Sequence, residues 1–255
     1  MDVSVVAIIA LTLVAFAAGL VDAIAGGGGL LTVPALLTAG LPPHVVFGTN
    51  KGQSVFGSFS ALLRFWRAGL VDRPRARVLF PLGLLGSFGG AALLLLVKPD
   101  VLKPVVLVLL VGAGLVVAFV RPPADAATKP TPKRAVLEGA VIALAIGAYD
   151  GFFGPGTGTF LIIAFVTVLH FSLQQASANA KVVNFASNLA AVILFTARGL
   201  VLWKVALPMA AGQFLGGAVG AHLAVKGGDR VVRRVVLLVV LALVVRLGYD
   251  VWTGP

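Results

Sequence analysis

The chain has 255 residues, of which 59% are hydrophobic and only 11% are charged, whereas soluble domains carry about 25% charged residues. With a mean hydropathy of +1.06, this composition excludes an ordinary soluble protein and predicts a polytopic membrane protein. The absence of cysteine excludes disulfides and thiolate metal sites, and three scattered histidines form no metal-ligand pattern. The net charge of +11 is concentrated in gaps between apolar runs, so we expect no nucleic-acid binding.

Ten apolar segments, five in each half, predict an all-α fold, because a membrane-spanning helix needs about 20 apolar residues. They lie near residues 3–23, 29–40, 44–66, 77–97, 101–120, 135–149, 157–171, 176–197, 203–224 and 230–252. The segments 29–40 and 157–171 are short and follow glycine runs, which predicts broken helices. Irregular backbone at membrane depth is tolerated only against protein or a wet cavity.

The two halves of the chain repeat one another at a distance near 130 residues. Gly19-Leu20-Val21-Asp22 returns as Gly147-Ala148-Tyr149-Asp150, the glycine run 26–29 returns at 154–158, and Gly69-Leu70-Val71 returns as Gly199-Leu200-Val201. This period is too long for a solenoid and favours two halves built around a shared site, as in secondary transporters. We therefore predict membrane repeats at 1–120 and 135–255, joined by a proline-rich, basic linker at 121–134.

Basic residues predict which ends of the segments face the cytoplasm. The stretches 64–77, 121–134 and 226–234 together contain thirteen lysines and arginines, which marks them as cytoplasmic loops. All three share one side only if each half crosses the membrane five times, which inverts the second half and places the N-terminus outside. Re-entrant short segments would instead give four crossings per half and two parallel halves. We favour the inverted arrangement.

Asp22 and Asp150 occupy matching positions, each just before a glycine run. A carboxylate at bilayer depth costs about 3 kcal/mol and needs a partner or water, although a helix cap or an interfacial position would also explain a single aspartate. Recurrence in both halves favours a functional role. The helices that begin after the glycines offer free N–H groups and a positive dipole end, which attract anions, whereas glycine could also serve only close helix packing.

Lys51 and Lys181 each open a long apolar segment that also carries polar residues. Lys181, Asn184 and Asn188 share one helical face by their spacing, as Lys51 does with Ser54. A lysine at such a position can instead extend its ammonium group to the membrane surface. The accompanying amides and hydroxyls favour the wall of a cavity that binds an oxyanion.

These motifs resemble a known family of bacterial permeases, the sulfite exporter TauE/SafE family. In the first half the resemblance lies in residues 19–29, Pro34 and 48–51, and in the second half it lies in 149–158 and 181–188. The resemblance implies transport of a small sulfur-containing anion, such as sulfite, a sulfonate or sulfoacetate, across the bacterial inner membrane.

We therefore predict a secondary transporter, possessing neither catalytic residues nor a cofactor, whose central site is formed by both halves. An anion channel and a membrane-embedded assembly factor without transport activity are the alternatives, and the expected partners are the anion, the lipid bilayer and, as one option, a second copy in a homodimer. Substrate binding is assigned to Lys51, Lys181, Asn50, Gln53, Ser54, Asn184, Asn188, Gly28, Gly29, Gly156, Thr157 and Gly158. Asp22 and Asp150 are expected to pair with the lysines or to carry coupled protons.

Overall fold

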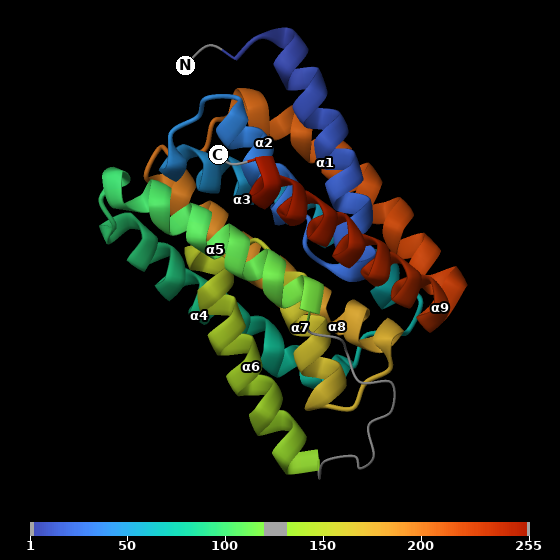
Figure 1. Cartoon of the computed structure of the whole chain (residues 1–255). Coiled ribbons are helices and arrows are strands. Elements are labelled where there is room, and N and C mark those ends of the chain that lie inside the picture. The colour runs from blue at the N-terminus through green and yellow to red at the C-terminus, as the bar shows by residue number, and fades with distance from the viewer. Residues whose placement is uncertain (1–2, 120–131, 254–255) are drawn as a thin grey trace.

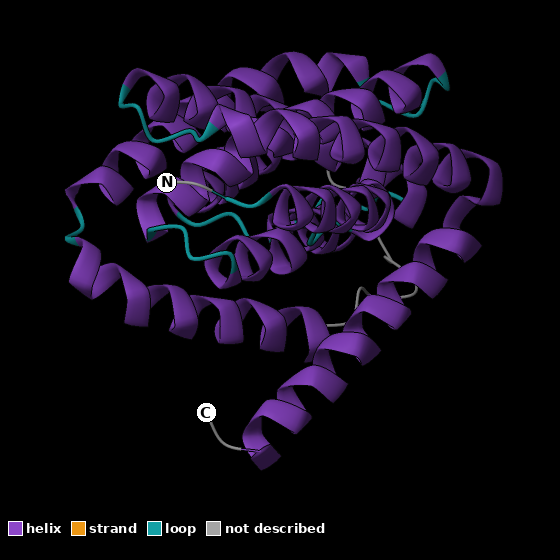
Figure 2. Cartoon of the chain, turned by 90° about the horizontal axis from the view of Figure 1, so that it is seen from above, coloured by secondary structure: helices purple, strands orange, loops and turns teal. Residues whose placement is uncertain are grey.

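The computed structural model describes residues 3–119 and 132–253, and within these ranges the chain forms helices and loops but no strand (Figure 2). The all-α prediction is therefore confirmed for the described residues. The helices are α1 (Val5–Ala25), α2 (Gly29–Thr38), α3 (Pro43–Arg67), α4 (Arg73–Leu96), α5 (Pro99–Phe119), α6 (Pro132–Phe152), α7 (Thr157–Thr167), α8 (Leu173–Ala197) and α9 (Trp203–Thr253). At Gly228 the backbone leaves the helical conformation (φ 59°, ψ −157°), so α9 consists of two helices that meet at a kink.

The helices lie close to the ten apolar segments expected from the sequence. The linker predicted at 121–134 lies mostly outside the described residues, but its last three residues form the first turn of α6 instead of a loop. Pro132 explains this difference, since proline fits the first turn of a helix, where its missing N–H is not needed. Hydrophilic side chains at Ser4, Asp72 and Ser172 cap α1, α4 and α8 by accepting a bond from a backbone N–H.

Helix lengths recur in the two halves in the same order. The first helices, α1 and α6, have 21 residues each, the short α2 and α7 have 10 and 11, and α3 and α8 have 25 each. Among the residues that the structure describes, four helices are long and apolar enough to cross a membrane: α1, α4, α8 and, from Arg134, α6. Such a chain is a multi-pass membrane protein, while the inverted orientation of its halves stays a prediction.

Helices of one half pack mainly on helices of the other half. α1 lies beside the part of α9 that precedes its kink, α4 lies beside α6, and α3 and α8 pack between these pairs (Figure 1). Glycines at every fourth position of α9, namely Gly212, Gly216 and Gly220, face the backbone of α1. Small residues of this kind let membrane helices approach closely.

The basic segments 64–77 and 226–234 lie at one end of the helix bundle. Arg64 at the end of α3 contacts His222 of α9 at 2.7 Å, and the guanidinium of Arg75 in α4 lies 5.0 Å from the ring centroid of Phe171. Nearby, the backbone N–H of Gln174 donates to Asp229 at 2.7 Å. At the opposite end the start of α3 meets the start of α9, where Leu202 donates its N–H to the Thr49 hydroxyl.

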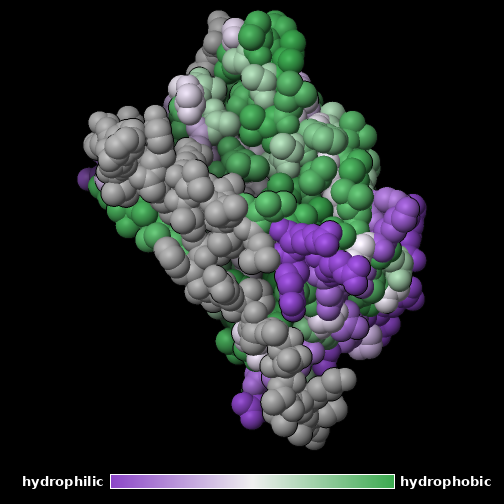
Figure 3. All heavy atoms as spheres, turned by 45° about the vertical axis from the view of Figure 1, so that its right-hand side comes forward, coloured by the Kyte–Doolittle hydropathy of each residue, from purple (hydrophilic) through white to green (hydrophobic). Residues whose placement is uncertain are grey.

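Large apolar side chains are exposed on the outer faces of several helices. The face in Figure 3 is hydrophobic over much of its described surface, while hydrophilic residues gather toward one end. Exposed examples on α1, α4, α6 and α9 are Ile9, Leu13, Leu85, Leu93, Leu137 and Leu215. A surface of this kind suits contact with lipid tails.

The close contact of α4 with α6 predicts that alanine at two glycine positions of α4 changes the free energy of unfolding to different extents. A methyl group at Gly86 would clash with the Leu144 carbonyl and lie 2.9 Å from the Ala148 nitrogen, whereas one at Gly89 would meet open space. We expect Gly86→Ala to lower the free energy of unfolding by about 1–3 kcal/mol through overpacking. Gly89→Ala should change it by no more than about 1 kcal/mol. Unfolding followed by circular dichroism in detergent distinguishes them, and equal stability would contradict this packing.

Candidate functional site

The two glycine runs meet where α2 and α7 begin. A Cβ atom placed on Gly158 would lie 2.7 Å from the Cα of Gly26, and one placed on Gly29 would lie 3.1 Å from the Cα of Pro155. The Thr159 hydroxyl donates to the Ala25 carbonyl at 3.0 Å across the same contact. Only residues without a Cβ let these backbones approach so closely. The N-termini of both short helices therefore lie side by side.

Two ion pairs inside the bundle join the halves of the chain, and of their four side chains only that of Asp22 is partly exposed, at 19%. Lys51 Nζ lies 2.8 Å from Asp150 Oδ1, and Lys181 Nζ lies 2.8 Å from Asp22 Oδ2, so each lysine pairs with the aspartate of the other half. The two lysines are 1% and 0% exposed. They do not extend to the membrane surface. A buried charge without a partner would cost several kcal/mol, so each pair requires the packing that brings its helices together.

Each aspartate also accepts a second hydrogen bond. The Ser187 hydroxyl of α8 donates to Asp150, and the Gly28 N–H donates to Asp22 Oδ1 at 3.2 Å. Because the four ionised side chains carry two positive and two negative charges, the positive charge that the sequence suggests is neutralised within the site.

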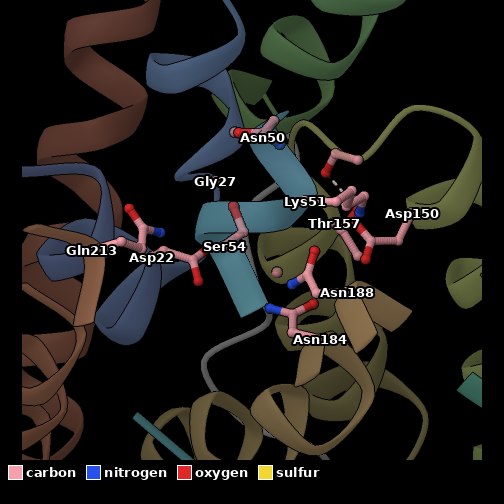
Figure 4. A pocket seen from close by; sticks show the side chains of 13 residues that line it. Asp22, Gly27, Asn50, Lys51, Ser54, Asp150, Thr157, Asn184, Asn188 and Gln213 are labelled. Atoms are coloured by element: carbon pink, nitrogen blue, oxygen red, sulfur yellow. Dashed lines mark hydrogen bonds and ion pairs between the residues drawn. The ribbon is translucent and has the colours of Figure 1, made fainter. Parts of the chain in front are cut away.

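A small cavity of about 30 Å³ lies between the ion pairs and the glycine loops (Figure 4). This volume holds only about two water molecules. Its lining combines residues of both halves: Asp22, Gly27, Gly29, Asn50, Lys51, Ser54, Asp150, Gly154, Thr157, Gly158, Asn184, Asn188 and Gln213. The cavity is almost wholly polar in its named side chains, which suits a small hydrophilic ligand.

Ten of the residues selected from the sequence line this cavity, and four lie behind it. Lys181 does not line the cavity itself, but it forms an ion pair with Asp22, which does. Gln53 donates to Asn50 Oδ1 at 3.0 Å and to the Ser54 hydroxyl at 2.9 Å, which holds both side chains in place. Gly28 binds Asp22 through its N–H, and Gly156 precedes the first turn of α7. These four residues support the lining without forming it.

Gln213, Gly27 and Gly154 line the cavity but were not selected from the sequence. Gln213 lies on α9, is 2% exposed, and its Oε1 has no hydrogen-bond partner among the described residues. The Asn184 Oδ1 is also unpaired within the described chain. A carboxamide in the middle of the apolar segment 203–224 is the signal that could have identified Gln213. In the first half the residue that matches Gln213 is Gly86, which has no polar side chain.

Comparisons with known proteins identify the family of the chain. The model of the family described as sulfite exporter TauE/SafE matches residues 11–247. A probable membrane transporter protein, ORF9, of Sinorhizobium sp is 40% identical over 249 residues, which cover 94% of each chain. A probable membrane transporter protein of Haemophilus influenzae is 38% identical over 98% of each chain. The probable membrane transporter protein YfcA of Escherichia coli K12 is 38% identical over 93% of this chain and 88% of its own. No solved structure matches.

The crossed ion pairs predict that removing one charged side chain of a pair lowers the free energy of unfolding more than removing both. Lys181→Met leaves Asp22, whose side chain is 19% exposed, without its cation, and we expect the free energy of unfolding to fall by about 1–3 kcal/mol. In the double variant Asp22→Asn with Lys181→Met no uncompensated charge remains, so most of the stability should return. Chemical unfolding in detergent measures both. A single variant as stable as the parent chain would show that the pair is absent.

Proposed function

Because the chain belongs to the sulfite exporter TauE/SafE family, we propose that it is a secondary transporter that moves a small sulfur-containing anion across the bacterial inner membrane. Sulfite, a sulfonate or sulfoacetate is the proposed substrate. The observation that carries the proposal is a polar cavity lined by both halves, with the Lys51–Asp150 ion pair and Asp22 in its lining and Lys181 paired with Asp22 behind it. The names of the relatives agree with a transporter and not with an enzyme.

The groups around the cavity suit an oxyanion. The Lys51 ammonium is held by the Asp150 carboxylate, and an anionic oxygen of the substrate can take the place of that carboxylate with the same geometry. The Asn188 and Asn184 side chains and the Ser54 hydroxyl supply further polar contacts. The first turn of α7 adds the Gly158 N–H at the positive end of a helix dipole, while the Thr157 N–H is already donated to the Gly154 carbonyl.

Charge balance suggests how transport is coupled to protons. Each lysine is already neutralised, so an anion alone would leave the buried site with an uncompensated negative charge. Protonation of Asp22 or Asp150 would release one lysine and restore neutrality once the anion is bound. We therefore expect the anion and a proton to move together in the same direction.

The shape of the site and the position of the basic segments support the remaining parts of the proposal. A cavity with room for about two water molecules supports alternating access over an open channel. The gathering of 64–77 and 226–234 at one end of the bundle supports a cytoplasmic location for that end.

Uptake of labelled sulfite into proteoliposomes tests the role of the buried lysines. Lys181→Ala removes a cation that forms a charge-assisted hydrogen bond worth about 1.5–3 kcal/mol, so uptake should fall by about 10-fold to 100-fold. The matched control is Lys204→Ala, since Lys204 is exposed at the start of α9 and should not affect uptake. The folded double variant Asp22→Asn with Lys181→Met should also be inactive. Normal uptake by that variant would show that the Lys181–Asp22 pair takes no part in transport.

A proton gradient tests the role of the aspartates. In the parent protein an inward proton gradient should stimulate uptake of sulfite, because each anion enters with a proton. The double variant Asp22→Asn, Asp150→Asn keeps the size of both side chains, but asparagine cannot exchange a proton. The stimulation by the gradient should therefore disappear. Uptake is compared with and without the gradient, using liposomes that lack protein as the background. Stimulation that persists in the Asp22→Asn, Asp150→Asn protein would place the coupled proton elsewhere.

A further inference from the structure

We infer that the units that move during transport are two intertwined bodies, each built from both halves of the sequence, instead of the halves themselves. This inference rests on the proposed transport function. Body 1 contains α1, α2, α3 and residues 203–227 of α9, and body 2 contains α4, α6, α7 and α8. Each helix of the pairs α1 with α9 and α4 with α6 packs most extensively on its partner from the other half. Between the bodies, α3 crosses α8 and the two glycine runs touch.

Backbone contacts inside each body leave little room for sliding. In body 1 a Cβ atom on Gly217 of α9 would lie 2.6 Å from the Gly57 carbonyl of α3. In body 2 a Cβ atom on Gly147 of α6 would lie 2.7 Å from the Gly83 carbonyl of α4. Helix pairs in which such contacts recur along the helices, as for α1 with α9 and α4 with α6, behave as rigid units, because movement within them creates voids or clashes. Between the bodies, the contact of Gly26 with Gly158 joins only helix ends. The halves are therefore poor candidates for rigid units, since their own helices share far fewer contacts.

Both ion pairs cross the boundary between the bodies. Lys51 of α3 in body 1 holds Asp150 of α6 in body 2, and Lys181 of α8 in body 2 holds Asp22 of α1 in body 1. The cavity is lined from both sides of this boundary (Figure 4). Protonation of an aspartate, or binding of an anion to a lysine, therefore acts directly on the contacts that hold the two bodies together.

The repeated Gly-Leu-Val sequences are the direct connections between the bodies. Gly69 ends α3 and Gly199 ends α8, with φ values of 72° and 67° that favour glycine. Each N–H closes its helix by donating three residues back, to Trp66 and to Thr196.

After the glycine, each connection is tied to the body that it enters. The Asp72 N–H donates to Asn179 of α8, and the Leu202 N–H donates to Thr49 of α3, both at 3.0 Å. A Cβ atom at Gly69 or Gly199 would meet nothing within 4 Å, so both glycines lie outside the packed interior. The glycine is thus the point at which each connection can bend, and we assign Gly69 and Gly199 as the two hinges.

Three phenylalanines allow a matched cross-linking test, which is simplified because the chain has no cysteine. The ring centroid of Phe185 in α8 lies 5.4 Å from that of Phe59 in α3 and 6.0 Å from that of Phe80 in α4. Both pairs join the two sequence halves, but only the first joins the two bodies. Cysteine pairs are introduced at 59 and 185, or at 80 and 185, and are closed with a short cleavable bifunctional thiol reagent.

The cross-link between 59 and 185, made with a linker that is cleaved by light because sulfite itself breaks disulfides, should abolish uptake of sulfite in proteoliposomes, and photolysis should restore it. The cross-link between 80 and 185 should leave uptake unchanged. Loss of uptake with both cross-links would favour movement of the halves and overturn the inference. Uptake that survives the cross-link between 59 and 185 would also overturn it, because the bodies would then not separate at α3 and α8.

Distances between spin labels separate a wrong substrate from a wrong assignment of the bodies. Leu215 of α9 shares a body with Ile9 of α1 but a sequence half with Leu137 of α6, and all three side chains are exposed. On acidification and on addition of sulfite, the distance from 215 to 137 should shift and the distance from 215 to 9 should stay constant. A shift of the 215–137 distance on acidification alone, with no response to sulfite and no uptake of it, would refute only the substrate. The opposite pattern, or constant distances in both pairs, would refute the bodies.

Discussion

The placement of two lysine–aspartate ion pairs inside an apolar bundle is the constraint on which the rest of the structure depends. In this fold Lys51 has its counter-ion on α6 and Lys181 has its counter-ion on α1, so each charge of one half is compensated by the other half. The desolvation of such groups is repaid only when the pairs form with good geometry. The helices must therefore interleave, and the α1–α9 and α4–α6 contacts bring the charges together.

Glycine makes that interleaving sterically feasible. The contact of Gly26 with Gly158 brings the N-termini of α2 and α7 together beside the ion pairs, and the glycines of α9 let α1 approach closely. Positive helix ends, the neutralised Lys51 and carboxamides then surround one small cavity. The same packing that stabilises the bundle thus creates a polar site within reach of both halves.

Much of the fold follows from local signals in the sequence, while the pairing of its charges does not. The lengths of the apolar runs predict α1 to α8 closely, and the recurrence of Asp22 and Lys51 at 150 and 181 predicts where polar groups gather. Which lysine meets which aspartate depends on contacts between residues more than a hundred positions apart, and no local spacing contains that information. Gln213 was missed for a related reason, because only the packing of α9 against α1 and α3 brings it to the cavity.

The exchange of helices between the halves has a consequence for the origin of this fold. If a half-length ancestor was duplicated, its charges and glycine-lined faces could be satisfied only by a second copy, in the manner of a domain-swapped dimer. The ancestral subunit would then have been an obligate dimer without a stable folded monomer. Fusion of the two genes would have preserved this mutual dependence within one polypeptide, and afterwards allowed each copy to diverge, as the glutamine of α9 illustrates.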